Sequence, residues 1–309
     1  MKSLFRWRRS APPPRPSDVQ GGRLFIIGAA RSGTTVLQNA LNHSPDVYLL
    51  GEPNLHLDAG APGFAARYNG MHRAWLNQET KSTFCPPVLG EDGPWRDYLQ
   101  ALGAHHRCVG AKIVVNPGGG PAWIEGLFTF HCREFYDARY IFTFRHPLAV
   151  VNSTRDLQHL SGSVVCSRAM AMANYAETVE LFLRCLRTLP HVRAIVHEDV
   201  SPEALDHLGR WLAIPTAGMF DYYDAARVRA YDAADFDPVE RRHLDLLAVL
   251  YEDLRQAIAQ GPRLPQIEQN DGNLSPGHYT ALGSIARRAA VIAASLRKID
   301  AEANMANPL

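Results

Sequence analysis

A short stretch, FIIGAARSGTT from Phe25 to Thr35, combines residue types that bind anionic groups. Gly28 and Gly33 stand at the spacing of the nucleotide-triphosphate loop G-x-x-x-x-G-K-[ST], but Thr34 occupies the lysine position. Arg31 is the only cation inside the loop. A helix that begins at Thr34 would direct backbone N–H groups and its positive end toward a phosphate or sulfate. The stretch therefore predicts an anion-binding loop without the lysine that reaches a γ-phosphate.

A second arginine follows a buried-strand pattern further along the chain. Residues 140–144 form an apolar run, and Arg145 comes where a nucleotide hydrolase would carry the aspartate that holds magnesium. Two arginines and no obvious magnesium carboxylate favour an anion-rich nucleotide bound without a metal. Arg31 and Arg145 could instead be surface arginines in ion pairs, but their expected place at adjacent strand ends favours binding.

Short apolar runs without alternation predict strands that are covered on both faces. They lie at residues 24–27, 47–50, 109–115, 140–144 and 192–196. Helical apolar periodicity fills the intervals, at 34–41, 123–135, 148–157 and 168–189. Strands that alternate with helices indicate an α/β protein: a P-loop-like three-layer α/β/α sandwich with a central parallel sheet of about five strands.

The C-terminal third predicts helices at 202–212, at 238–259 and from about residue 280. The last helix carries an apolar stripe of fewer than three heptads, so we expect it to pack on its own domain instead of on a second subunit. Residues 23–309 are thus predicted to form a single domain with a C-terminal helical extension. Residues 1–22 are predicted to be a disordered proline-rich tail, with weak membrane contact as an alternative role.

Composition excludes several classes of function. Lys and Arg number 32 against 31 Asp and Glu, so a net charge of +1 provides no global field for nucleic acid. Five cysteines, an odd number without a C-x-x-C pair, argue against a zinc site and suit a reducing compartment, which predicts a cytoplasmic protein. No apolar stretch is long enough to span a bilayer.

Taken together, these segments resemble the sulfotransferases that use 3′-phosphoadenosine-5′-phosphosulfate (PAPS). GAARSGTT is similar to the family's 5′-phosphosulfate loop in the arginine version of tyrosylprotein, carbohydrate and many bacterial members. FRHPLAVVNS resembles the 3′-phosphate motif, whose arginine and serine would be Arg145 and, eight residues later, Ser153. A third similarity, IVHEDVSPEALDHLGRWLAIP, extends the resemblance to residues 23–215. It implies PAPS as co-substrate, no metal, and a binding set of Arg31, Ser32, Gly33, Thr34, Thr35, Arg145 and Ser153.

The resemblance also implies a general base. Cytosolic members place a histidine two residues after a strand lysine, but in AKIVVNP that position after Lys112 is Val114. Tyrosylprotein-type members use a glutamate, and SPDVYLLGEPN places Glu52 twenty-one residues after Arg31. Glu52 should also end a strand beside the loop, at the edge where open α/β sheets bind ligands. We expect Glu52 to be the base and Arg31 to stabilise the departing charge; Glu52 as a loop cap or an arginine's partner is the alternative.

Other polar residues near these motifs have open roles. His56 could be a second base or an acceptor-site residue, although a surface-loop histidine is the preferred interpretation. Lys112 could approach the sulfuryl group or the acceptor, and whether Lys112 or Asn116 matches the family's basic strand residue is open. His105 and His106 are expected in solvent. The stretch from 53 to 108, with mixed aromatic and polar residues, is expected to form the acceptor wall.

The leading functional hypothesis is sulfuryl transfer from PAPS to a hydroxyl or amine. A small-molecule, carbohydrate or lipid acceptor is expected, and the sequence leaves the acceptor and the oligomeric state open. A P-loop kinase or nucleotide hydrolase is the first alternative, disfavoured by Thr34 and the missing metal-binding acid. The second is a non-catalytic nucleotide-binding protein on the same scaffold.

Overall fold

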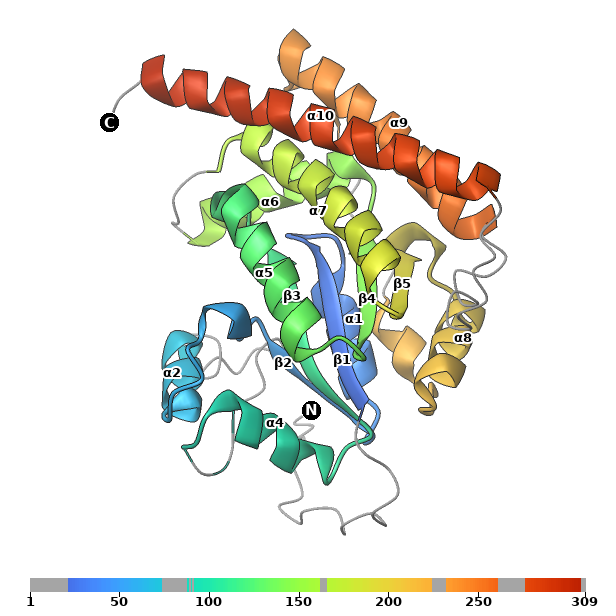
Figure 1. Ribbon diagram of the computed structural model, residues 1–309. Coiled ribbons are helices and arrows are strands. Elements are labelled where there is room, and N and C mark those ends of the chain that lie inside the picture. The colour runs from blue at the N-terminus through green and yellow to red at the C-terminus, as the bar shows by residue number, and fades with distance from the viewer. Residues whose placement is uncertain are drawn as a thin grey trace, which may run out of the picture.

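A five-stranded parallel sheet forms the centre of the protein (Figure 1). A computed structural model describes residues 22–73, 88, 90, 92–161, 166–223, 232–260 and 276–306. The sheet has the order β2-β3-β1-β4-β5, and each neighbouring pair runs parallel. Its strands are β1 (Gly22–Ala29), β2 (Val47–Gly51), β3 (Cys108–Val115), β4 (Arg139–Phe144) and β5 (His191–Val196). All five predicted strands are confirmed, and their C-terminal ends meet at one edge.

Helices cover both faces of the sheet. Along β1, Phe25 and Ile27 belong to one hydrophobic core, whereas Leu24 and Ile26 belong to another, as the alternation of side chains along a strand requires. The larger core includes residues of α5 (Gly120–Glu134) and α7 (Arg168–Thr188), and the smaller includes α1 (Thr34–Asn42) and α8 (Pro202–Leu212). The three-layer α/β/α sandwich is therefore confirmed, and the continuous apolar strands are explained by their two buried faces.

A serine N-cap marks the start of the central helix α7. Ser167 is its N-cap, and the Ser167 side chain accepts a hydrogen bond from the Met170 backbone N–H. The helix ends at Thr188, within one residue of the predicted end. Most of its residues are buried, because it packs between the sheet and the C-terminal helices.

The C-terminal helices pack on the sandwich. α9 (Pro238–Gln260) and α10 (Pro276–Ala306) lie against α7, with α10 running across it in Figure 1. Apolar α10 side chains such as Ile285, Ala289 and Leu296 are buried in the larger core. Arg297 of α10 also donates two hydrogen bonds to the Glu177 carboxylate of α7, at 2.8 and 2.9 Å. The prediction that the stripe packs on its own chain is confirmed.

Some elements differ from the sequence prediction. α2 (Phe64–Met71) and α4 (Trp95–Gly103) were not predicted; each is short, and only a few apolar residues mark its buried face. α6 (Pro147–Ser161) extends further than 148–157. Gly22 belongs to β1 and not to the predicted tail, whose residues 1–21 lie outside the described residues. Single turns of 3-10 helix are η1 (Leu55–Leu57), η2 (Pro117–Gly119), η3 (His197–Asp199) and η4 (Met219–Tyr222).

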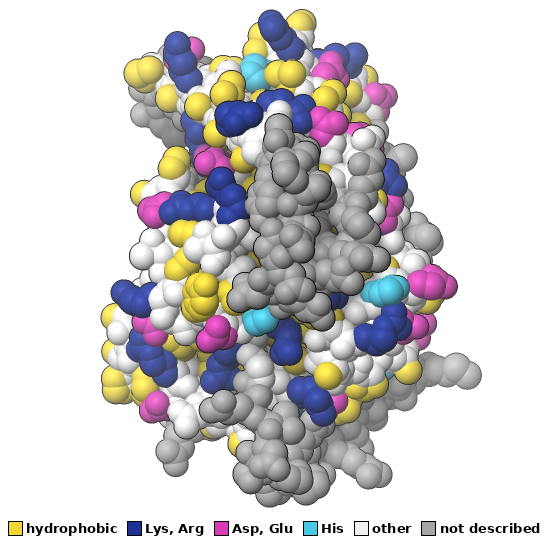
Figure 2. All heavy atoms as spheres, turned by 45° about the vertical axis from the view of Figure 1, so that its right-hand side comes forward, with side chains coloured by type: hydrophobic (Ala, Val, Ile, Leu, Met, Phe, Trp, Pro, Cys, Tyr) yellow, Lys and Arg dark blue, Asp and Glu magenta, His cyan; other side chains and the backbone are white. Residues whose placement is uncertain are grey.

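Charged side chains of both signs are mixed on the surface. In Figure 2, Lys and Arg lie among Asp and Glu over the described residues of the face that is drawn. This mixture agrees with the net charge of +1. Binding of an anion must therefore depend on local groups, which the edge formed by the strand C-termini provides.

Candidate active site

The glycine loop joins the end of β1 to the start of α1. Gly33 has φ 98° and Arg31 has φ 68°, so two left-handed residues turn the chain back on itself. A Cβ on Gly28 would lie 2.4 Å from both Ser32 Oγ and Thr143 Oγ1, which are 2.9 Å apart. Because Gly28 faces Thr143 across the β1–β4 pair, only glycine leaves room for this buried hydroxyl contact. The loop is thus tightly closed against β4.

The first turn of α1 faces the loop and provides hydrogen-bond donors. Its N-cap, Gly33, has no side chain, and no side-chain hydrogen bond caps the helix. The first N–H groups of any α-helix have no partner inside the helix. They and the helix dipole therefore favour an anion here, with the hydroxyls of Thr34 and Thr35 beside them.

The second predicted phosphate motif lies next to the loop. β4 ends at Phe144, Arg145 follows directly, and Ser153 is a buried residue of α6. Arg31 Nε donates a hydrogen bond to Ser153 Oγ at 2.8 Å. Since β1 and β4 are neighbours, the expected placement of Arg31 and Arg145 at adjacent strand ends is confirmed. The structure thus joins the two motifs through one hydrogen bond.

Backbone contacts hold Arg145 in place. Tyr175 of α7 donates its hydroxyl to the Arg145 carbonyl at 3.0 Å. Glu198 accepts a hydrogen bond from the His146 N–H at 2.9 Å and another from the Tyr251 hydroxyl at 2.8 Å. The Arg145 side chain is half-buried, and no described acceptor receives a hydrogen bond from its guanidinium. A half-buried cation in this position is suited to an anionic ligand.

His197, a residue that sequence analysis left without a role, lies beside this pair of motifs. A Cβ on Gly33 would approach His197 Nδ1 to 2.9 Å. Burial first, and then the nearby Arg145, lower the pKa of His197. The ring is therefore neutral at neutral pH and leaves the positive charge of this corner to the arginines. Its position directly after β5, the strand beside β4, was the available signal.

Glu52 and Lys112 form an ion pair at the other side of the loop. Lys112 Nζ donates to Glu52 Oε1 at 2.7 Å and to Thr35 Oγ1 at 3.2 Å. The Lys112 side chain is 0% exposed and that of Glu52 is 30% exposed. Lys112 is in register with Ile26 on β1, which places it on the face that α1 covers. One buried ammonium thus connects the predicted base to the first turn of α1.

The position of Glu52 in the sheet corrects one expectation. Glu52 follows the last residue of β2, at the C-terminal edge as predicted, but β3 lies between β2 and the loop strand β1. Lys112 on β3 bridges this gap. The alternative that Glu52 pairs with an arginine is also wrong in its partner, because the cation is the strand lysine.

The backbone of Glu52 is in the left-handed region, with φ 50°. Such a conformation costs a non-glycine residue on the order of 1–3 kcal/mol and persists where surrounding contacts impose it. The Glu52 N–H donates to the Lys112 carbonyl at 2.9 Å, and the preceding Gly51 N–H donates to the Tyr68 hydroxyl at 3.1 Å. Strain is therefore concentrated at the residue predicted to be the base.

His56, near this edge, and His106, before the start of β3 at the opposite edge, are both half-buried. His56 packs edge-on against Trp123 with ring centroids 4.6 Å apart, and burial lowers its pKa to about 4. His56 was expected to be a surface-loop histidine, but it lies half-buried in η1. His106 donates its Nδ1–H to the Pro45 carbonyl at 2.9 Å, and its ring packs on that of Tyr48. Because its pKa is lowered to about 4, His56 does not titrate near neutral pH.

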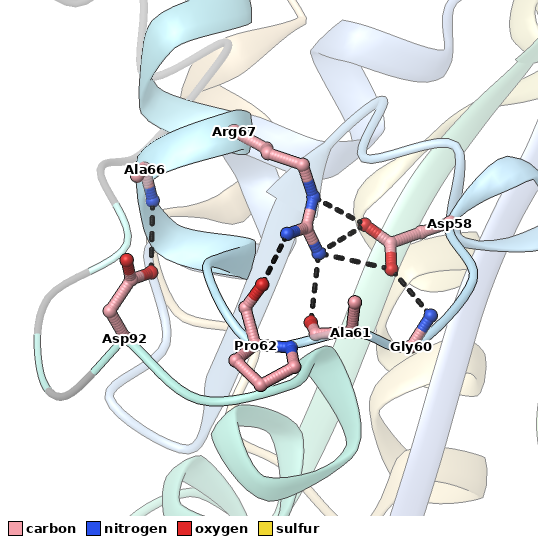
Figure 3. A network of polar contacts seen from close by, with 7 residues as sticks. All are labelled: Asp58, Gly60, Ala61, Pro62, Ala66, Arg67 and Asp92. Carbon is pink, nitrogen blue, oxygen red and sulfur yellow. Dashed lines mark hydrogen bonds and ion pairs between the residues drawn. The ribbon is translucent and has the colours of Figure 1, made fainter.

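A polar network fixes the segment between η1 and α2 (Figure 3). Arg67 Nη2 donates to the Asp58 carboxylate at 2.9 Å, and Arg67 Nε does so at 3.1 Å. The same guanidinium reaches the carbonyls of Ala61 and Pro62. Asp92 accepts a hydrogen bond from a backbone N–H in the first turn of α2. The predicted acceptor wall therefore begins with an ordered loop and helix, while residues 74–87 lie outside the described residues.

Comparison with known protein families identifies the family of this chain. A model of the sulfotransferase family matches residues 23–198, more than half of the chain. The chain belongs to the sulfotransferase family. The matched region contains the glycine loop, Glu52, Lys112 and the Arg145 motif, so the resemblance given by the sequence motifs is confirmed. No match to a curated protein was found.

Three solved structures of low sequence identity are also similar to this sulfotransferase. The sulfotransferase domain from the Synechococcus PCC 7002 olefin synthase is 19% identical, covers 88% of this chain and 97% of its own, and has a TM-score of 0.47. A sulfotransferase from Alicyclobacillus acidocaldarius is 15% identical, with coverages of 73% and 90% and a TM-score of 0.42. The sulfotransferase STF9 from Mycobacterium avium is 17% identical, with coverages of 76% and 77% and a TM-score of 0.45.

The described residues contain neither a membrane-spanning helix nor a metal-binding cluster. None of the helices in the described ranges is long and apolar enough to cross a membrane. In the same part of the chain, no group of three or more His, Cys, Asp or Glu residues could hold a metal ion.

Proposed function

We propose that this sulfotransferase uses PAPS as its co-substrate and transfers the sulfuryl group to a hydroxyl or amine acceptor, with Glu52 as general base. The acceptor oxygen or nitrogen forms a bond to sulfur while the bond from sulfur to the bridging phosphate oxygen breaks. Glu52 takes the acceptor's proton, and adenosine 3′,5′-bisphosphate leaves with the negative charge. The reaction needs a base on one side of the sulfuryl group and positive charge on the other.

This proposal rests on the contacts of the buried Lys112 ammonium with the proposed base and with the first turn of α1. Lys112 donates to Glu52 and to Thr35, so the proposed base lies within two hydrogen bonds of the anion-binding helix end. Arg31 and Lys112 flank the first turn of α1 from opposite sides. We propose that both stabilise the charge that builds up on the departing oxygen, through electrostatics organised before the reaction.

The described residues fit the two anionic groups of such a nucleotide. The amides and hydroxyls from Ser32 to Thr35 would hold the 5′-phosphosulfate, at a helix start that no side-chain hydrogen bond caps. Arg145 and Ser153 would hold the 3′-phosphate. Neighbouring strands are separated by about 4.8 Å, so adjacent strand ends suit two anionic groups carried by one ribose.

The acceptor would approach Glu52 from the segment between β2 and β3. This segment includes η1, α2 and α4, and its mixture of aromatic and polar residues suits a carbohydrate, lipid or small-metabolite hydroxyl. The exposed part of the Glu52 side chain is the part that would meet this hydroxyl. Candidate acceptors can be screened by mass spectrometry for a gain of one sulfuryl group in the presence of PAPS.

Calorimetry with two nucleotides tests the co-substrate assignment. Adenosine 3′,5′-bisphosphate should bind about 10- to 100-fold more tightly than adenosine 5′-monophosphate, because charge-assisted hydrogen bonds contribute about 1.5–3 kcal/mol. Arg145→Ala should remove most of this difference. A folded protein that binds neither nucleotide, or binds both equally well, would exclude PAPS. Binding without transfer to any screened acceptor would favour the non-catalytic alternative.

A further inference from the structure

The conformation of Glu52 depends on contacts that lie outside the ion pair. β2 is the edge strand of the sheet, paired only with β3 among the described strands. An edge strand presents N–H groups that no neighbouring strand accepts. The Gly51 N–H is such a group, and the Tyr68 hydroxyl of α2 accepts its hydrogen bond at 3.1 Å. Tyr68 therefore completes the end of β2 directly before Glu52.

His72 provides a second contact from the same helix. The imidazole of His72 forms a hydrogen bond with the backbone of Glu52. Because this bond favours the protonated ring, the imidazole is the donor and the Glu52 carbonyl is the acceptor. His72 is 6% exposed, and its ring packs on that of Tyr68 with centroids 4.7 Å apart. His72 lies four positions after Tyr68, which places both rings on one face of a helical turn.

The surroundings of His72 keep its ring neutral. Burial is the main cause that lowers the pKa of His72, and Lys112 lowers it further, whereas Glu52 raises it. A neutral ring keeps one N–H donor for the Glu52 carbonyl. It adds no second positive charge that would compete with Lys112 for the Glu52 carboxylate. The histidine can therefore hold the backbone while the lysine holds the side chain.

We propose that Tyr68 and His72 are a positioning pair that imposes the left-handed backbone of Glu52 and so keeps its carboxylate on Lys112. This inference rests on the proposed role of Glu52 as the base. It assigns a purpose to α2, whose short sequence predicts little helix by itself. The Arg67 and Asp58 contacts of Figure 3 seat the start of this helix, and the pair occupies its last turn and the residue that follows.

Single-group variants test the pair. Tyr68→Phe removes only the hydroxyl, and His72→Phe removes the donor while keeping a ring. Hydrogen exchange at the Gly51 amide should become at least about tenfold faster in Tyr68→Phe. Turnover, kcat, should fall about 3- to 10-fold in each variant, with the acceptor KM and the affinity for adenosine 3′,5′-bisphosphate within about twofold of wild type. These ratios correspond to the loss of one hydrogen bond.

Two controls separate positioning from general stability. His72→Gln keeps an N–H donor and should recover most of the kcat lost in His72→Phe. Tyr140→Phe removes another buried hydroxyl, which donates to the Phe135 carbonyl at 2.7 Å. It should lower the melting temperature as much as Tyr68→Phe does, but leave kcat and Gly51 exchange unchanged.

The outcomes distinguish this inference from the proposed function. The positioning pair is overturned if hydrogen exchange at the Gly51 amide is unchanged in Tyr68→Phe. It is also overturned if Tyr68→Phe and His72→Phe both keep the wild-type kcat in an active enzyme. If Glu52→Gln keeps wild-type turnover, the assignment of the base fails instead. The exchange measurement then still decides whether Tyr68 holds the end of β2, because it does not depend on activity.

Discussion

The proposed nucleotide side of the site and its proposed acceptor side are built in different ways. The nucleotide side consists of two short segments, the β1–α1 loop and the β4–α6 junction, whose binding groups are largely backbone N–H groups and two arginines. The acceptor side joins Glu52 after β2, Lys112 in β3 and His72 after α2, which are far apart in the sequence. The proposed anion-binding groups are therefore placed by local geometry, whereas the proposed reacting centre depends on tertiary contacts.

This difference predicts two classes of variants. Changes on the proposed nucleotide side other than at Arg31 should mainly alter nucleotide affinity, because those groups contact charges present before and after the reaction. Changes on the acceptor side should mainly alter turnover, because Glu52 and Lys112 act while charge and proton move. Single variants on each side test this division.

The largest effect is expected for Lys112→Met. It removes the ammonium that contacts both Glu52 and Thr35, and kcat should fall about 100- to 1,000-fold, as for other preorganised charge donors. Nucleotide affinity should change much less. Lys298→Met, at a 77% exposed lysine of α10, is the matched control. Turnover within threefold of wild type would remove Lys112 from the reacting centre.

A smaller effect concerns the acid stability of the core beneath the acceptor side. Burial lowers the pKa of His131 to about 3, below the value of about 6.5 for an unfolded histidine. The unfolded state therefore takes up the proton first, and stability is lost as the pH falls below about 6.5. This loss is about 2 kcal/mol between pH 8 and pH 5.

Thermal unfolding at these two pH values checks this expectation. When the pH falls from 8 to 5, the melting temperature of His131→Phe should decrease less than that of wild type. His56, whose pKa is lowered to about 4, accounts for part of the remaining loss. His207→Ala, at an exposed position of α8, should behave like wild type. An equal pH dependence in wild type and His131→Phe would contradict the buried neutral ring.

Ser153→Ala should weaken binding of adenosine 3′,5′-bisphosphate about tenfold, since one hydrogen bond to a charged group is lost. Adenosine 5′-monophosphate should bind nearly as well as to wild type, and kcat at saturating PAPS should change little. Thr154→Val is the control, because the Thr154 hydroxyl donates within α6 to the Val150 carbonyl at 2.8 Å. Equal losses of affinity for both nucleotides would show that Ser153 does not bind the 3′-phosphate.

The smallest effect is expected for Arg67→Ala on the acceptor side. The Arg67 side chain is 45% exposed, so its ion pair with Asp58 contributes about 0.2–1 kcal/mol to stability. The acceptor KM should rise about two- to fivefold as the loop loosens, with nucleotide affinity unchanged. Lys298→Met serves again as a surface control. A change in nucleotide affinity without a change in KM would contradict this assignment.

The sheet, its flanking helices and the segments of the proposed nucleotide side could be predicted from sequence for a common reason. Continuous apolar runs mark strands covered on both faces, and the GAARSGTT loop carries its turn and helix start within a few residues. Arg145 was found because it directly follows such a run. In each case the signal and the structure lie within the same short segment.

The acceptor side could be predicted only in part. Glu52 was found from its motif and strand end, but its partner was not, because Lys112 is sixty residues away and meets Glu52 only through the β2–β3 register. Tyr68 and His72 lie on a helix too short to give a clear periodic pattern. Their proposed roles rest on the hydrogen bonds to Gly51 and Glu52, which no local spacing indicates.

The most direct test compares Glu52→Gln with Arg145→Ala in one experiment that measures nucleotide affinity and kcat for each. Glu52→Gln should lose about 100-fold or more in kcat while its affinity for adenosine 3′,5′-bisphosphate stays within about twofold of wild type. Arg145→Ala should lose about 10- to 100-fold in that affinity while keeping most of its kcat at saturating PAPS. If both variants lose the same quantity, or if Glu52→Gln turns over like wild type, the division between a binding side and a reacting side is wrong.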